Sequence, residues 1–336
     1  MSHNITIEGG TSKRLPVAGK YCDQDIIITA TGGGGGGGDI DAVVDGTLTV
    51  LNSNVTAVKP YFNYEKTALK SVSLPLATSI GDYAFYNNTN ITSLNAPLLK
   101  TVGEYAFYEC DIPSLDCPEI TTLGQYAFYG NGNMTSFNLP KLSSMGNYAF
   151  RNCTNLRAVS LPSLASATGS YGFYQCTSLT TADLPNTTNI NSNCFGYCSA
   201  LVSVSAPKAT AVASYGFRNC TALQEITLPS VTTLNTYAFQ TCTALKKVDL
   251  PKCTTINGNT FNGCTALDTI ILRSTTRCTL SATSAFTNTC FASGKTGGKV
   301  YVPSALIESY QTANVWKTFV GYGTLEFVAI EGSEYE

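Results

Sequence analysis

A phenylalanine recurs every 21 to 23 residues through most of this 336-residue chain. A proline keeps the same spacing in the same part of the sequence, usually directly after Leu or Ala. A single repeat of this length cannot bury its own apolar face, so a core forms only when neighbouring repeats stack on one another. We therefore expect a solenoid built from stacked turns. The repeat phenylalanines are Phe85, Phe107, Phe128, Phe150, Phe173, Phe195, Phe217, Phe239 and Phe261.

The pattern within one repeat predicts a short strand followed by a return segment. In the repeat that begins at Leu156, Val159 and Leu161 alternate with polar residues and Pro162 ends the strand, because proline lacks a backbone donor. A further aliphatic residue stands five positions before each repeat phenylalanine and is expected to point inward. A period of 20–29 residues with this spacing is typical of leucine-rich repeats. These aliphatic residues are Ile80, Val102, Leu123, Met145, Ile190, Val212, Leu234 and Ile256.

Seven of the 13 cysteines occupy one slot, three residues after the repeat phenylalanine. Asn88 and Asn131 stand at that slot in two other repeats. We interpret this column as a structural turn position, where Cys acts as a small apolar side chain with a weak donor. A disulfide or metal role is the less favoured alternative, since His3 is the only histidine and no CxxC pair is present. The column contains Cys110, Cys153, Cys176, Cys198, Cys220, Cys242 and Cys264.

The repeat resembles the BspA-like leucine-rich repeats of bacterial surface and phage proteins. The phrase LxxVxLPxxTxIGxYAFxxCTxL is matched by KSVSLPLATSIGDYAFYNNTNI and QEITLPSVTTLNTYAFQTCTAL, and the resemblance covers roughly residues 45–290. It implies a mostly β leucine-rich-repeat solenoid of about 10 turns of ~22 residues, with a capping segment after the repeats.

The order of segments predicts five parts. The amino-terminal stretch has strand-like ends around Ile5–Ile7 and Asp25–Thr29. An uninterrupted glycine run follows, which we interpret as a flexible linker because no GK[ST] phosphate-binding signature accompanies it. We predict a small N-terminal β module (1–31), a poly-Gly linker (32–38), an N-terminal cap repeat (39–68), the solenoid (69–291) and a C-terminal cap (292–336).

The C-terminal cap is predicted to contain a short helix. The rhythm breaks after Leu267, where Leu272-Arg273 replaces the usual Leu-Pro and the next phenylalanine, Phe286, arrives late. YVPSALIESYQTANVWKTF then suggests a helical stretch, with Ser304 as its N-cap and Trp316 as an apolar anchor. GTLEFVAI is expected to be a closing strand.

Composition excludes several classes of function. The net charge is −2 and no Lys/Arg-rich run occurs, so we expect no nucleic-acid partner. No apolar stretch is long enough to span a membrane, and MSHNITIEGG does not resemble a signal peptide. Without a Ser–His or Cys–His arrangement or closely paired carboxylates, we expect no enzyme, no catalytic residues, no metal and no cofactor.

Two surfaces are candidates for binding a partner. Tyrosines flank the repeat phenylalanines and would supply contact area at low entropic cost. Small polar residues on the outer strand face could instead form a groove for sugar hydroxyls. The structural alternatives are that the rings stack on one another and that the polar side chains pair across turns. The candidate ligand surface comprises Tyr83, Tyr86, Tyr105, Tyr108, Tyr126, Tyr129, Asn95, Asp116 and Asn138.

The leading functional hypothesis is a non-enzymatic receptor-binding protein of a phage or prophage tail. The segment RLPVAGKYCDQDIIITATGG is similar to a module at the start of tail-associated proteins of phages and prophages from gut Firmicutes. That resemblance implies a virion location, attachment to other tail proteins through residues 1–31, and a bacterial cell-surface glycan or protein as partner. Homo-oligomerisation is an alternative role for the module. The rival hypotheses are a bacterial surface leucine-rich-repeat adhesin and a structural tail component without a foreign ligand.

Overall fold

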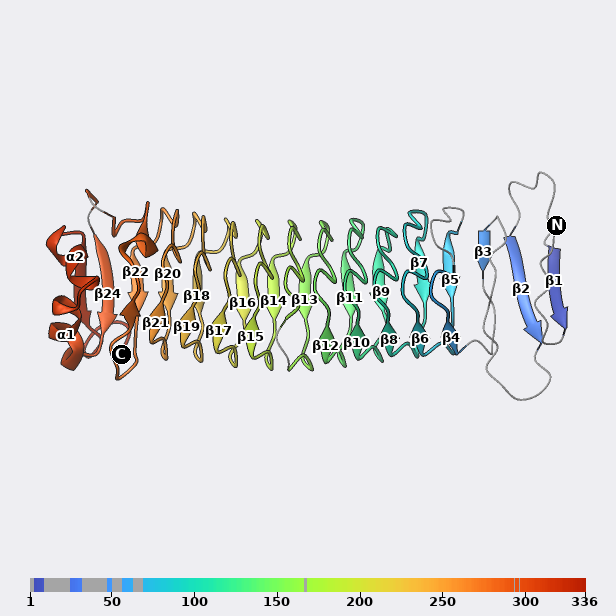
Figure 1. Cartoon of the computed structure of the whole chain (residues 1–336), viewed down its shortest axis with the longest axis horizontal. Coiled ribbons are helices and arrows are strands. Elements are labelled where there is room, and N and C mark those ends of the chain that lie inside the picture. The colour runs from blue at the N-terminus through green and yellow to red at the C-terminus, as the bar shows by residue number, and fades with distance from the viewer. Residues whose placement is uncertain are drawn as a thin grey trace. The chain divides into compact units, whose positions relative to one another are not determined.

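The computed structural model describes residues 3–8, 25–31, 47–49, 56–62, 69–165, 168–292, 294–295 and 297–336. The chain divides into two compact units, residues 1–156 and 157–336. Each unit contains stacked, parallel turns, so the mostly β solenoid expected from the repeat is confirmed (Figure 1). The poly-Gly run 32–38 and residues 63–68 of the predicted cap repeat lie outside the described residues. The domain boundaries predicted above remain a prediction.

Unit 1 begins with a three-stranded parallel sheet in the order β1-β2-β3. Both strands expected in the N-terminal module are present, and His3 pairs with Ile26 at the start of their register. The strands are β1 (His3–Glu8), β2 (Asp25–Thr31) and β3 (Thr47–Thr49).

The repeats of unit 1 each contribute two short strands. The two-residue strands form one five-stranded parallel sheet, and the three-residue strands pair as β5-β7 and β9-β11. The two-residue strands are β4 (Ala57–Val58), β6 (Ser79–Ile80), β8 (Thr101–Val102), β10 (Thr122–Leu123) and β12 (Ser144–Met145). The three-residue strands are β5 (Ser71–Ser73), β7 (Ser93–Asn95), β9 (Ser114–Asp116) and β11 (Ser136–Asn138).

Unit 2 repeats this arrangement. Its three-residue strands are β13 (Ala158–Ser160), β14 (Thr181–Asp183), β16 (Ser203–Ser205), β18 (Glu225–Thr227), β20 (Lys247–Asp249) and β22 (Thr269–Ile271). Its two-residue strands are β15 (Asn189–Ile190), β17 (Ala211–Val212), β19 (Thr233–Leu234), β21 (Thr255–Ile256) and β23 (Thr279–Leu280). The described residues of the two units thus contain five two-residue strands each, which agrees with about ten turns.

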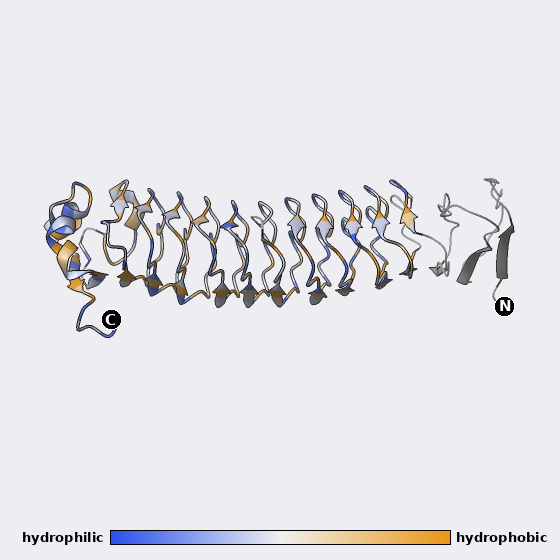
Figure 2. Cartoon of the chain, turned by 90° about the horizontal axis from the view of Figure 1, so that it is seen from below, coloured by the Kyte–Doolittle hydropathy of each residue, from blue (hydrophilic) through white to orange (hydrophobic). Residues whose placement is uncertain are grey.

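The two-residue strands contain the aliphatic residues expected to point inward, and all eight of those side chains are buried. The sequence pattern indicated their direction but not their strand pairing. Apolar and polar residues alternate around each turn, as the colouring in Figure 2 shows. The core therefore runs through the inside of the stacked turns rather than lying at one centre.

The repeat phenylalanines form a stacked ladder inside each unit. In unit 1, Phe107 lies 5.1 Å from Phe85 and 5.2 Å from Phe128, measured between ring centroids, with nearly parallel planes. In unit 2, the ladder continues to the late Phe286, which stacks on Phe261 at 5.6 Å. Each ring is almost fully buried. Because the turns repeat at about the spacing of parallel strands, identical rings fall into contact without further adjustment.

The cysteine column supports the backbone of the preceding turn. The thiol of Cys110 donates to the carbonyl of Phe85 at 2.9 Å, and Cys242 donates in the same way to Phe217 at 3.0 Å. At the same slot, the Asn131 amide donates to the carbonyl of Phe107 at 2.8 Å. All twelve described cysteines are free thiols, and eleven of them are buried. The structural interpretation of this column is therefore confirmed.

The C-terminal cap closes unit 2 with helices and two longer strands. Trp316 is buried and donates from its indole nitrogen to the carbonyl of Cys278 at 2.9 Å, which confirms its anchoring role. The prediction of Ser304 as N-cap is wrong, because α1 starts after Leu306 and no side chain caps it. Ser304 is instead the first residue of the short η2 turn that precedes α1. The elements are η1 (Thr283–Phe286), β24 (Gly298–Val302), η2 (Ser304–Leu306), α1 (Ile307–Thr312), α2 (Trp316–Gly321) and β25 (Leu325–Ala329), the predicted closing strand.

Replacing a ring in the middle of a ladder should destabilise the protein strongly. Phe217 is fully buried between Phe195 and Phe239, at 5.4 and 5.2 Å. We expect Phe217→Ala to lower the free energy of unfolding by about 3–5 kcal/mol, and Phe217→Leu by less than about 1.5 kcal/mol. Urea unfolding followed by far-UV circular dichroism measures both. Ser205→Ala on the exposed strand face is the control, within about 0.5 kcal/mol of the parent. A loss below about 1 kcal/mol for Phe217→Ala would contradict the ladder as a main source of stability.

The cysteines should differ in reactivity according to burial. Burial raises the pKa of the half-buried Cys290 thiol to about 11, with a further contribution from Asp268, and the column thiols are buried completely. A raised pKa lowers the thiolate fraction at pH 8, and only the thiolate is alkylated. With iodoacetamide at pH 8, we expect slow modification of Cys290 and none of Cys220. The rate at Cys290 should keep rising to about pH 11 instead of levelling near pH 9. Guanidinium-unfolded protein, in which every thiol reacts, is the control for peptide mass spectrometry.

Candidate binding surface

The corner around each repeat phenylalanine forces the preceding tyrosine into an unusual backbone conformation. Tyr83, Tyr105 and Tyr126 have φ values of 55°, 53° and 54°, in the left-handed region that most side chains avoid. The amide of Tyr83 donates to the carbonyl of Glu104 in the next turn at 2.8 Å. Asn, which tolerates this region, takes the same slot at Asn193 in unit 2. The position of this tyrosine column is therefore set by the tight corner.

The tyrosines before the phenylalanine stack into a ladder of their own. Tyr105 lies 4.7 Å from Tyr83 and 4.5 Å from Tyr126, and the ladder extends through Tyr148 and Tyr61 at its two ends. The ring planes differ by at most 12°. These centroid distances match the separation of adjacent strands in a sheet.

The tyrosines after the phenylalanine form a second ladder beside the first. Tyr108 stacks on Tyr86 at 4.8 Å and on Tyr129 at 4.6 Å. Within each turn the two tyrosines touch in a tilted geometry, with ring centroids 5.8 Å apart for Tyr105 and Tyr108. We call the resulting set the double tyrosine row. It consists of Tyr83, Tyr86, Tyr105, Tyr108, Tyr126 and Tyr129, all half-buried.

Stacking decides which atoms the double tyrosine row presents. The ring faces cover one another, so ring edges and hydroxyl groups remain for contact with solvent. Burial raises the pKa of Tyr108 well above its ordinary value, with further contributions from Glu109 and Tyr129. Burial likewise raises the pKa of Tyr126. The phenols of Tyr108 and Tyr126 therefore stay protonated at physiological pH and retain a donor as well as an acceptor.

A cation lies at one end of the double tyrosine row, and two acidic residues lie beside its first tyrosines. The guanidinium of Arg151 lies 5.7 Å from the ring centroids of both Tyr129 and Tyr148. Asp82 and Glu104 precede the first tyrosines of the row, and the Asp82 carboxylate accepts the amide of Glu104 at 2.8 Å. The row therefore combines phenol hydroxyls with carboxylates along one edge of unit 1.

The remaining candidates lie on a different part of the turn. Asn95, Asp116 and Asn138 stand on β7, β9 and β11 and are exposed, as expected for the outer strand face. The Asn138 amide donates to the Asp116 carboxylate at 2.9 Å, and the Asn95 amide donates to the Ser73 hydroxyl at 3.3 Å. The structure thus brings the six tyrosines together and separates them from a polar, internally paired strand face.

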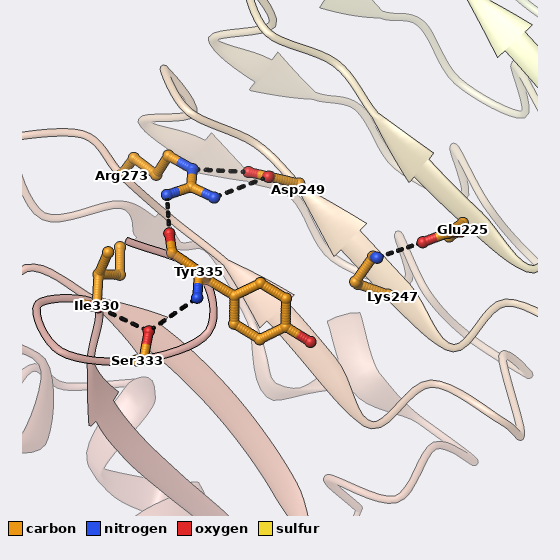
Figure 3. Close-up of polar contacts among 7 residues, drawn as sticks. All are labelled: Glu225, Lys247, Asp249, Arg273, Ile330, Ser333 and Tyr335. Carbon is orange, nitrogen blue, oxygen red and sulfur yellow. Dashed lines mark hydrogen bonds and ion pairs between the residues drawn. The ribbon is translucent and has the colours of Figure 1, made fainter.

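Sequence reasoning missed a second cluster, on the strand face of unit 2. Arg273 donates through Nε and Nη2 to the two carboxylate oxygens of Asp249, at 3.3 and 3.1 Å, and through Nη1 to the carbonyl of Tyr335 (Figure 3). Lys247 forms an ion pair with Glu225 on the next strand. The replacement of the usual proline by Arg273 was the available signal, whereas Tyr335 belongs to no periodic column.

Within the described ranges, no group of three or more His, Cys, Asp or Glu side chains is arranged to hold a metal ion. Among the same residues, no helix is long and apolar enough to cross a membrane.

Comparison with solved structures finds similar repeat proteins at low identity. A leucine-rich repeat protein from Bacteroides ovatus shares 21% identity over 87% of this chain and 91% of that chain, with a TM-score of 0.39. A leucine rich cell surface protein from Faecalibacterium prausnitzii shares 20% over 84% of each chain, with a TM-score of 0.38. The pneumococcal vaccine antigen PcpA shares 14% over 84% and 85%, with a TM-score of 0.41. No curated protein matched the sequence.

The family itself is established by the sequence of the repeats. The family model described as BspA type leucine rich repeat region matches in six copies, over residues 56–163, 121–213 and 188–302. These matches cover most of the chain and coincide with the stacked turns of both units. The chain therefore belongs to the BspA-type leucine-rich-repeat family.

Proposed function

We propose that this chain is a non-enzymatic binding protein that uses the edge of its repeats for adhesion. The observation that supports this function is the double tyrosine row, in which six half-buried rings lie side by side along unit 1. Rigid tyrosines offer contact area and hydrogen bonds at low entropic cost. Catalysis finds no comparable support, since no group of side chains suited to hold a catalytic metal ion is present within the described residues.

The geometry of the row favours an extended partner over a small ligand. The hydroxyl groups recur with the period of the turns, so a chain with regularly spaced polar groups would meet several of them at once. A cell-surface glycan strand or an extended segment of a surface protein has that form. Repetition of weak contacts raises the overall affinity by increasing the effective concentration of each successive contact.

The setting that we propose first is the bacterial cell surface, where the protein would act as a leucine-rich-repeat adhesin. The repeat array that the family model matches supports this setting, which in addition requires export of the protein from the cell. The phage-tail setting is the second proposal and depends on the resemblance of residues 14–33 to tail-associated modules. Those residues lie upstream of the family match, and most of them lie outside the described residues. Self-association through residues 1–31 is also a proposal.

Protease treatment of intact cells and proteomics of purified virions distinguish the two settings. Tryptic peptides from residues 56–302, released from intact cells and absent from virions, would support the adhesin. The same peptides in density-purified virions, absent from the shaved cell surface, would support the tail protein and overturn the first setting.

Removing the second tyrosine ladder, Tyr86, Tyr108 and Tyr129, should weaken adhesion while leaving the fold intact. We expect the triple variant Tyr86→Ser, Tyr108→Ser and Tyr129→Ser to bind whole bacterial cells at least tenfold more weakly than the parent, because half of the row is lost. Flow cytometry with fluorescently labelled full-length protein measures the binding, and circular dichroism checks the fold.

A matched control comes from the stacked pair in unit 2. Tyr215 and Tyr237 lie 4.9 Å apart with parallel rings, so their replacement by Ser removes the same kind of stacking. We expect this double variant to bind cells like the parent. Unchanged binding by the triple variant, or equal losses in both variants, would refute the double tyrosine row as the binding surface.

A further inference from the structure

We propose that the strand face of unit 2 carries a second binding site, independent of the double tyrosine row, which holds one neutral pyranose ring against Tyr335. The site is a pocket of about 290 Å³, lined by Tyr335 together with Gln224, Glu225, Lys246, Lys247, Asp268 and Thr269. We call it the Tyr335 pocket. Its volume lies just below the range of typical small-molecule sites, which suits a single sugar ring.

Tyr335 differs from the tyrosines of the row in how its ring is packed. It packs partly buried against the apolar cluster of Ile271, Tyr301 and Ile330. Tyr301 meets it edge-on, with ring planes at 74° and centroids 4.7 Å apart, so the two rings are not stacked face to face. In Figure 3 the ring lies beside β20, the strand that carries Lys247 and Asp249. A half-exposed ring that has no parallel neighbour among the described residues offers the aromatic face that the C–H groups of a sugar require.

The ring is held in place before any ligand arrives. Arg273, fixed by two hydrogen bonds to Asp249, donates to the carbonyl of Tyr335. The amide of Tyr335 donates to the hydroxyl of Ser333 at 3.1 Å, and that hydroxyl donates to the carbonyl of Ile330 at 2.6 Å. Groups fixed in this way lose little conformational entropy on binding, which favours affinity.

The charges around the pocket point to a neutral, hydroxyl-rich ligand. Glu225 and Asp268 contribute two carboxylates, and Lys246 and Lys247 contribute two ammonium groups, so the net charge of the lining is zero. Carboxylates accept hydrogen bonds and ammonium groups donate them, whereas a sugar hydroxyl does both. An anionic or cationic ligand would meet like charges on part of the lining. A neutral pyranose pairs with both kinds of group and places its C–H face on the ring.

Saturation-transfer difference NMR with the full-length protein tests this site. The probes are the methyl glycosides of glucose, galactose, mannose and N-acetylglucosamine, each added separately, with glucuronic acid and glucosamine as charged comparisons. We expect at least one neutral glycoside to receive saturation on the C–H protons of one ring face. Tyr335→Ala should weaken its binding at least tenfold, whereas Tyr335→Phe, which keeps the ring, should bind within about threefold of the parent.

The controls separate this site from the double tyrosine row. The triple variant of Tyr86, Tyr108 and Tyr129 should bind the same glycoside as the parent does. Circular dichroism confirms that Tyr335→Ala is folded, and Tyr335→Phe reports on the ring if the alanine variant unfolds. No transfer to any neutral glycoside, transfer only to the charged sugars, or equal binding by the parent and folded Tyr335→Ala would overturn the proposal.

Discussion

The backbone hydrogen bonds between the corners of successive turns determine the rest of this structure. The amide of Phe85 donates to the carbonyl of Ala106 at 2.8 Å, and Phe217 donates to Ala238 at the same distance. Because the same bond recurs one turn later, equivalent residues are held at a strand-like separation. Stacked phenylalanines, stacked tyrosines and thiols under the preceding carbonyl are consequences of that spacing. The apolar core stabilises the turns, and the corner bonds set their register.

This constraint gives the tyrosines a structural role besides any role in binding. A left-handed residue costs conformational energy, roughly 1–2 kcal/mol for most side chains. Stacking on both neighbours offsets part of that cost, since aromatic pairs contribute about 0.5–1.5 kcal/mol beyond burial. The tyrosines of the double tyrosine row therefore do stack on one another, as the structural alternative to ligand binding predicted. The same stacking leaves the hydroxyl edge as the part that a partner would touch.

The strand face differs between the two units in how its polar residues are used. In unit 1, Asn138 and Asp116 pair with each other across adjacent strands. In unit 2, Arg273 stands at the position of the repeat proline. It donates hydrogen bonds both to the Asp249 carboxylate and to the carbonyl of Tyr335. An aromatic residue is thereby added to an otherwise polar face. The place where the repeat loses its regularity is thus where a pocket forms.

Repetition made the fold predictable from the sequence, and the lack of repetition limited what could be predicted about the sites. The burial of a column such as Phe85, Phe107 and Phe128 can be predicted, because the same residue type recurs at the same position in nine copies of one pattern. The burial of Cys220 followed from the same reasoning. The left-handed backbone of Tyr83 did not, since it depends on the bond from Tyr83 to Glu104 in another turn.

The sequence by itself determined the solenoid, the period of its turns, the inward columns and the presence of a helical cap. Only the tertiary structure decided that the six tyrosines stack with their faces covered, that Asn95, Asp116 and Asn138 lie apart from them, and that Tyr335 meets Lys247 and Arg273. The physical reason is the range of the interactions. Periodic burial is encoded within one turn of about 22 residues, whereas stacking geometry and the Tyr335 pocket arise from residues that are one to several turns apart in the chain.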